Sequence, residues 1–183
     1  IQISRATAQL SFPARFQLVA AMNPCPCGYL TSRSTNAQQR CTCTLEQIQR
    51  YRKKISGPLL DRIDLHVSVN SLSIDELNLG TKKHNENEPS LAIRERVIAA
   101  RTIQYKRQEC NNADLSVKQL EHYCPLGEVE RELIGRAIET MGLSARAYHR
   151  IVKVAQTIAD LSASPSIEHA HIGEALGLRN FDR

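Results

Sequence analysis

Tryptophan is absent from the 183-residue sequence, and aromatic residues make up only 4% of it. This scarcity argues against an aromatic stacking platform of the kind with which many proteins bind single-stranded nucleic acid. The sequence contains no run of about 18 apolar residues, and residues 1–30 lack the pattern of a secretory signal, so neither a membrane span nor export is indicated. We therefore expect a soluble, cytoplasmic protein.

A second absence concerns the binding of phosphate. No segment matches Gly-x-x-x-x-Gly-Lys-Ser/Thr, the loop that cradles nucleotide phosphates in many ATPases. The chain alone is therefore not expected to hydrolyse ATP. Because residue 1 is Ile and residues 1–4 already have the pattern of a strand, we expect that the chain is a piece of a longer protein. The six histidines show no spacing typical of metal ligands or of a catalytic triad.

Positive charge is concentrated in the first third of the chain. Residues 1–58 contain eight Lys and Arg against one acid, Glu46, whereas residues 59–183 contain sixteen against eighteen. Such a bias can attract the phosphates of a nucleic acid or of a nucleotide, but it does not define a site. The residues that could face DNA are Arg5, Arg15, Arg33, Arg40, Arg50, Arg52, Lys53 and Lys54. For the last four of these, a solvated helix face is an equally good interpretation.

The first part of the chain has the pattern of an α/β fold. Residues 16–22 form an almost continuous apolar run, which is typical of a strand buried on both faces of a parallel sheet. A capping-box pattern at Thr44 predicts a helix that reaches about Ile55, where Ser56-Gly57-Pro58 is expected to stop it. The alternation of residues 63–69 predicts a second strand. Polar side chains that follow such strands commonly contact ligands, so Asn23 is a candidate from its position alone.

From residue 90 onward the pattern is helical. Helices are predicted over residues 90–110, 127–141, 144–161 and 166–176, with a short one opened by a capping box at residues 116–119. The apolar face of the helix over 144–161 is defined by Ile151, Ala155, Ile158 and Leu161. The sequence therefore predicts an α/β portion over residues 1–69, a polar linker over 70–89 and an all-helical domain over 90–183.

Four of the six cysteines form two Cys-x-Cys pairs that are separated by thirteen residues. They are Cys25, Cys27, Cys41 and Cys43. Four thiolates can close a tetrahedral zinc site, which would pin the loop between the pairs. The one-residue gap within each pair is shorter than the usual two to four, and reduced cysteines without a metal are the alternative in the cytosol. The other two cysteines, Cys110 and Cys124, are isolated on predicted helices and are interpreted as core or surface residues.

Three segments carry a resemblance to a known family. They are residues 18–28 (LVAAMNPCPCG), 56–65 (SGPLLDRIDL) and 143–150 (LSARAYHR). Together, and in this order, they resemble the magnesium-chelatase-like branch of the AAA+ ATPases, most closely the group of ComM/YifB competence-helicase proteins. The resemblance spans essentially the whole chain. It implies the C-terminal part of an AAA+ P-loop core, with its sensor-1 strand and arginine-finger region, followed by a helical lid. The Walker A and Walker B elements would precede residue 1.

The resemblance also implies roles for four residues. Asn23 matches the sensor-1 position, where a neutral amide can hold the attacking water or the γ-phosphate; its alternative is a cap at the exit of a strand. Arg62 matches the arginine finger that is presented to a neighbouring subunit's nucleotide; its alternative is an ion pair with an adjacent aspartate. Arg146 matches the sensor-2 arginine, and Arg150, one turn further along, is the second choice. Either could also be an ordinary solvated arginine.

On this resemblance, the intact protein is expected to form a hexameric ring that couples the binding and hydrolysis of ATP with Mg²⁺ to remodelling of, or translocation on, DNA. Arg146 would act either in its own subunit or across the interface. Two alternatives remain: a zinc-clasped module that binds nucleic acid without enzymatic activity, and the motor subunit of a metal chelatase, which would drive a partner protein.

Overall fold

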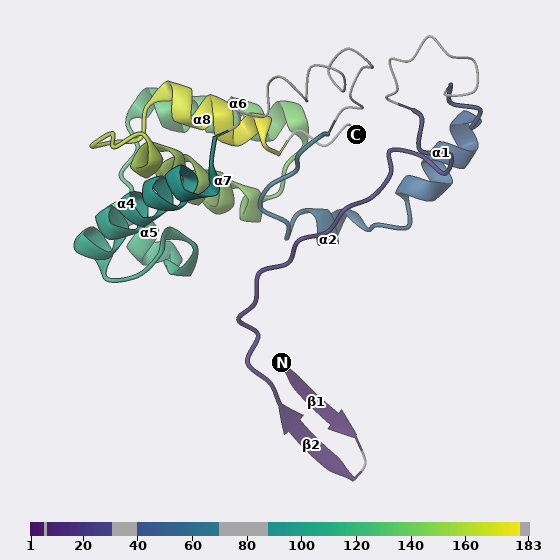
Figure 1. Ribbon diagram of the computed structural model, residues 1–183, viewed down its shortest axis with the longest axis horizontal. Helices are drawn as coiled ribbons and strands as arrows, with labels where there is room; N and C mark the ends of the chain where they lie inside the picture. Colours follow the sequence, from purple (N-terminus) through teal and green to yellow (C-terminus); the bar gives the residue numbers. More distant parts are fainter. Residues whose placement is uncertain (6, 31–39, 70–87, 180–183) are drawn as a thin grey trace. The chain divides into compact units, whose positions relative to one another are not determined.

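The computed structural model describes residues 1–5, 7–30, 40–69 and 88–179. The chain divides into two compact units, Ile1–Tyr51 and Arg52–Arg183, which Figure 1 shows coloured along the sequence. Within the described ranges, no helix is long and apolar enough to cross a membrane. Arg33 and most of the predicted linker lie outside the described residues.

The first unit begins with a β-hairpin, drawn in purple in Figure 1. Strands β1 (Gln2–Arg5) and β2 (Ala8–Ser11) pair antiparallel, with Ile3 opposite Leu10 and Arg5 opposite Ala8. Because side chains alternate between the two faces of a strand, Ile3, Leu10 and Arg5 share one face and the Gln and Ser residues share the other. All eight strand residues are exposed, and Arg5 lies next to the turn.

The strands predicted over residues 16–22 and 63–69 are not formed. Both segments lack strand pairing, and their apolar side chains are largely exposed, as for Val19 at 84%. A strand of a parallel sheet needs hydrogen-bonding partners along its edges and a layer packed on each face. Among the described residues, β1 and β2 form the only sheet, and they pair with each other. The α/β core therefore stays a prediction for the longer protein.

The predicted helix after Thr44 is present but ends early. Helix α1 (Leu45–Arg52) opens with the expected capping box: Gln47 N donates to Thr44 Oγ1 at 3.3 Å, and Thr44 N donates to Gln47 Oε1 at 3.0 Å. The segment that was predicted to stop this helix instead starts another. Ser56 caps the short helix α2 (Gly57–Leu60) by accepting a hydrogen bond from Leu59 N.

The rest of the second unit is helical, as predicted. It contains α4 (Ser90–Gln108), the 3-10 helix η2 (Asn112–Asp114), α5 (Val117–Tyr123), α6 (Glu128–Met141), α7 (Ala145–Leu161) and α8 (His169–Gly177). The capping box at the start of α5 is confirmed, with Ser116 and Gln119 bonded to each other's backbone amides. Gly142 ends α6 at a φ of 59°, a conformation that favours glycine.

Helix α7 lies at the centre of this unit and packs against α4, α5, α6 and α8. Its predicted apolar face is confirmed for Ile151, Ala155 and Ile158, which are buried in the core. Leu161 is 40% exposed instead, because α7 ends at this residue. Cys124 is also a core residue, and burial raises the pKa of its thiol to about 11. The half-buried Cys110 packs against the same core.

A buried carboxylate joins α4 to α7. The Asp160 side chain is fully buried, and it accepts hydrogen bonds from Arg107 at 2.7 and 3.0 Å, from Asn112 at 2.8 Å and from Gln156 at 3.1 Å. The hydrogen bond to Asp160 is also the main reason why the pKa of Arg107 is raised. Four donors offset the cost of removing this charge from water, so Asp160 is a structural group of the helical unit.

Candidate nucleotide cleft and cysteine cluster

A cleft of about 320 Å³ in the second unit brings together two of the arginines predicted from the sequence. It is lined by Pro58, Asp61, Arg62, Ser144 and Arg146. The first three belong to α2 and its C-terminal end, and the last two to the start of α7. Two segments that are far apart in the sequence therefore contribute one guanidinium each to the same cleft.

Arg62 follows the end of α2 and is exposed. Its Nη1 donates to the Pro58 carbonyl at 2.6 Å, a contact that lies within the same turn of chain. The proposed alternative, an ion pair with Asp61 or Asp64, is not formed within the described residues. A guanidinium has five N–H donors, so most of those on Arg62 are left for a ligand.

Arg146 is exposed in the first turn of α7, and the residue that precedes this helix has an unusual environment. Ser144 occupies the N-cap position, yet its side chain makes no capping hydrogen bond. Its Oγ is buried and has no hydrogen-bond partner among the described residues. Buried hydroxyls are normally paired, and the first amides of a helix carry partial positive charge. Sequence analysis placed Ser144 only at the start of the helix predicted over residues 144–161; the pattern Ser-x-Arg at a helix start is the signal that could have identified it as a candidate site residue.

Arg150 does not line the cleft, but it contacts the segment that carries Arg62. Its Nη1 donates to the carbonyl of Arg62 at 2.7 Å and forms an ion pair with Asp64. The buried Arg179, which sequence analysis did not single out, donates to the carbonyls of Ile63 at 3.3 Å and of Asp61 at 3.5 Å. The segment that carries Arg62 is thus fastened to α7 and to the end of α8 by two arginines.

Asn23 lies in the first unit, two residues before a turn that begins at Cys25, and not at the end of a strand. The turn is closed by a hydrogen bond from Gly28 N to the Cys25 carbonyl at 3.0 Å. Gly28 has a φ of 85°, which favours glycine, and a Cβ at this position would lie 3.7 Å from Nδ2 of Asn23. The Asn23 side chain is exposed and rests against this glycine.

The four cysteines of the two Cys-x-Cys pairs converge in the same unit. The Sγ atom of Cys25 lies 3.3 Å from that of Cys27 and 3.7 Å from that of Cys41, and the last two are 3.6 Å apart. With Cys43 included, all four Sγ atoms lie within 4.8 Å of one another. These separations are too long for disulfide bonds, which are about 2.05 Å.

The cluster has an uneven electrostatic environment. Backbone N–H groups of Tyr29 and then Thr42 hold the pKa of the Cys27 thiol down to about 6, because they donate hydrogen bonds that favour the thiolate. Loss of solvent contact raises the pKa of Cys43 to about 12. A cation placed among the four sulfurs would favour the ionised form of every thiol.

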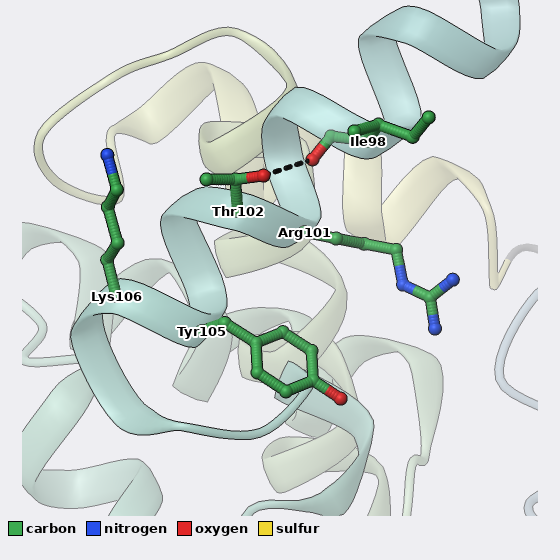
Figure 2. Close-up of a pocket in the computed structure, with 5 residues that line it drawn as sticks. All are labelled: Ile98, Arg101, Thr102, Tyr105 and Lys106. Atoms are coloured by element: carbon green, nitrogen blue, oxygen red, sulfur yellow. Dashed lines mark hydrogen bonds between the residues drawn. The ribbon is translucent and has the colours of Figure 1, made fainter.

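A second hollow, of about 480 Å³, runs along one face of α4 and is shown in Figure 2. Its lining residues are Ile98, Arg101, Thr102, Tyr105 and Lys106. All five come from one helix, and Thr102 Oγ1 is already bonded to the Ile98 carbonyl at 2.8 Å. This hollow is an open helix face without converging polar groups.

Most of the basic residues predicted to face DNA lie at the surface. Arg5, Arg15, Arg40, Arg50, Lys53 and Lys54 are exposed, and Arg52 is half-buried at the end of α1. Contact with DNA stays a prediction.

Two family comparisons together cover nearly all of the chain. Residues 1–77 match the family "Magnesium chelatase, subunit ChlI", and residues 87–179 match "Magnesium chelatase, subunit ChlI C-terminal".

Curated relatives align along the same length. The chain is 44% identical to "Competence protein ComM" of Haemophilus influenzae and 37% identical to "Uncharacterized protein YifB" of Salmonella typhimurium; in both cases the whole chain is covered. It is 32% identical to "Uncharacterized protein Mb2921c" of Mycobacterium bovis, over 98% of the chain. In each case the chain spans about a third, 34%, of the relative's length. The chain is thus a member of the magnesium chelatase subunit ChlI family, and the second family match assigns its helical domain to the C-terminal part of that subunit.

Proposed function

We propose that the intact protein is a ring-forming AAA+ ATPase, hexameric and cytoplasmic, whose subunits use the Arg62–Arg146 cleft to contact the phosphates of ATP. The observation that carries this proposal is that both arginines line one cleft of a single chain. A guanidinium stays charged and can contact two phosphate oxygens, which suits it to stabilise the charge that develops during phosphoryl transfer. The buried Ser144 hydroxyl, which has no hydrogen-bond partner among the described residues, adds a further donor.

The shared cleft supports one of the two modes of action left open for Arg146. If Arg62 reaches the nucleotide held by a neighbouring subunit, then Arg146, which lines the same cleft, reaches that nucleotide as well. Both arginines would thus act across the interface, whereas Asn23 would act on the nucleotide of its own subunit. The lining residues fit phosphate rather than Mg²⁺, because Asp61 is the one carboxylate among them. No step through the metal is assigned to them.

DNA is the substrate that we propose for the motor. A relative that is 44% identical is named as a competence protein, and the strong positive charge of residues 1–58 can attract a phosphate backbone. Arg5, exposed beside the hairpin turn, is the residue that we expect to contact it. DNA should therefore stimulate hydrolysis, and Arg5→Glu should weaken DNA binding while basal hydrolysis is retained. Hydrolysis stimulated by a partner protein and unaffected by DNA would instead favour a chelatase motor.

The cleft is tested by substitution in the intact protein. Arg62→Ala should lower kcat about 10³-fold, as expected for an arginine finger, while nucleotide binding is retained. Arg146→Ala should also lower kcat, by a smaller factor. Arg136→Ala is the matched control, because Arg136 is an exposed helix arginine whose ion pair is with Glu132 on the same helix. Turnover by Arg62→Ala equal to that of Arg136→Ala would contradict the assignment.

Mixed rings test action across the interface. Subunits carrying Asn23→Ala and subunits carrying both Arg62→Ala and Arg146→Ala should each be inactive alone. When mixed, the nucleotide held by a double-variant subunit meets an intact Asn23 in its own subunit and two intact arginines from the neighbour. We therefore expect hydrolysis to return on mixing. If Arg146 acts within its own subunit, these mixed rings stay inactive, and only the ring mixed from Asn23→Ala and Arg62→Ala regains activity.

A further inference from the structure

We infer that Cys25, Cys27, Cys41 and Cys43 bind one zinc ion in a structural tetrathiolate site. A tetrahedral zinc site has Zn–S bonds of about 2.3 Å, which places neighbouring sulfurs about 3.8 Å apart. Three of the Sγ–Sγ distances, 3.3, 3.6 and 3.7 Å, are close to this value, and the fourth sulfur is within 4.8 Å of the others. The sulfurs therefore already form a cage of the size that one ion requires.

The short spacing within each pair does not prevent this geometry. Cys-x-Cys is tighter than the usual spacing, but the turn from Cys25 to Gly28 folds the first pair so that its two sulfurs approach to 3.3 Å. The backbone amides of Tyr29 and Thr42 donate to the Cys27 sulfur. Hydrogen bonds of this kind orient and stabilise thiolate ligands in metal sites.

The first unit has little else to hold it together. Among its described residues, Cys25 and Ile48 are the buried apolar ones, and the hairpin is wholly exposed. A segment with so small a core needs an additional constraint, and a structural zinc ion supplies one because the free energy of metal binding becomes free energy of folding. An iron–sulfur cluster would place its own irons and sulfides between the cysteines, so a cage this small fits a single ion.

The position of Asn23 suggests what the ion does, and this step rests on the proposed function. Asn23 lies two residues before the first ligand, and its side chain rests against Gly28, one residue after the second. An ion bound to Cys25 and Cys27 would fix the turn against which the Asn23 side chain rests. The zinc site would therefore act as a positioning element for the amide that orients the attacking water.

Metal analysis of the intact protein is the first test. After removal of loosely bound metal, we expect about one zinc per chain by mass spectrometry, released when a thiol-modifying reagent is added. Cys41→Ser and Cys43→Ser should each lose it, whereas Cys110→Ser, which changes a cysteine outside the cluster, should retain it. Cys43→His keeps a zinc-binding side chain and should retain the ion with lower affinity.

Spectroscopy on the wild-type protein tests the inference even if the serine variants fail to fold. Replacement of the metal by Co²⁺ should give the strong visible absorption of a tetrahedral thiolate site. A purified protein without metal, in which all four thiols react freely, would overturn the inference. A disulfide between these cysteines, or stoichiometric iron in place of zinc, would overturn it too.

Enzyme kinetics separate the positioning role from a purely structural one. Asn23→Ala and loss of zinc should both lower kcat, the latter about 10- to 100-fold, with nucleotide affinity unchanged. Asn23→Ala should retain its zinc. If Asn23→Ala hydrolyses ATP normally while zinc is present, the proposed function of Asn23 fails and the metal site stands. If Asn23→Ala is impaired and the wild type holds no zinc, the metal site fails and the function stands.

Discussion

The two units of the chain differ in where their apolar side chains lie. In the helical unit, α7 is surrounded by other helices and buries residues such as Ile151 and Ala155 completely. In the first unit, the apolar run over residues 16–22 has no regular secondary structure and is exposed. A helix satisfies its own backbone hydrogen bonds and needs only packing, whereas a strand needs both partners and packing. The helices therefore complete a core by packing on one another, whereas the run over residues 16–22 has no strand partner among the described residues.

Among substitutions that compare the two units, we expect the largest loss of stability from removing the buried charge of Asp160. Asp160→Ala leaves Arg107 without its buried partner, so we expect it to lower the free energy of unfolding of the helical unit by about 3–5 kcal/mol. Glu46→Ala, which changes an exposed acid of the first unit, should stay within about 0.5 kcal/mol. Urea unfolding followed by circular dichroism measures both. Equal effects would mean that the Asp160 network does not stabilise the fold.

A smaller effect is expected from apolar truncation. Ile151→Ala creates a cavity in the core and should cost about 3 kcal/mol, within the usual range for such changes. Val19→Ala removes an exposed methyl pair and should cost less than about 0.5 kcal/mol in this chain. The same urea titration compares them. A large cost for Val19→Ala would show that residues 16–22 are packed, and the contrast between the units would be lost.

The smallest effect concerns two similar helix caps, one in each unit. Ser116→Ala removes the capping box of α5 and should lower the stability of the helical unit by about 1 kcal/mol. Thr44→Ala removes the equivalent cap of α1 and should increase amide exchange there, without moving the main unfolding transition. Hydrogen exchange resolved by residue tests this. A shift of the main transition by Thr44→Ala would show that the two units unfold together.

These features explain how much of the fold could be predicted. Helix limits depend on local chemistry, such as the Ser116–Gln119 box and the left-handed Gly142, and they were found within a few residues. Strands over 16–22 and 63–69 were predicted from periodicity, which reports the tendency to be buried but not whether partners are present. The helix over residues 57–60 was missed because Ser56-Gly57-Pro58 was interpreted as a stop, although Pro is also common in the first turn of a helix.

For the candidate sites too, features that depend on local sequence could be predicted, and features that depend on distant residues could not. The arginines of the cleft and the four cysteines could be selected from short motifs. The sequence could not show that the hydroxyl of Ser144 is buried with no partner in the described part of the chain, or that Arg179 reaches the carbonyl of Ile63. Each depends on contacts between residues that are far apart in the chain, which no local pattern encodes.

The hydrogen bond from Arg150 to the carbonyl of Arg62 couples the two arginines of the cleft. Arg146 and Arg150 lie one turn apart on α7, so the helix that bears one guanidinium of the cleft also holds the backbone that bears the other. A ligand that displaced Arg146 would therefore displace the segment that carries Arg62 as well. Because α7 also packs against α4, α5, α6 and α8, it connects both guanidiniums of the cleft to the surrounding helices.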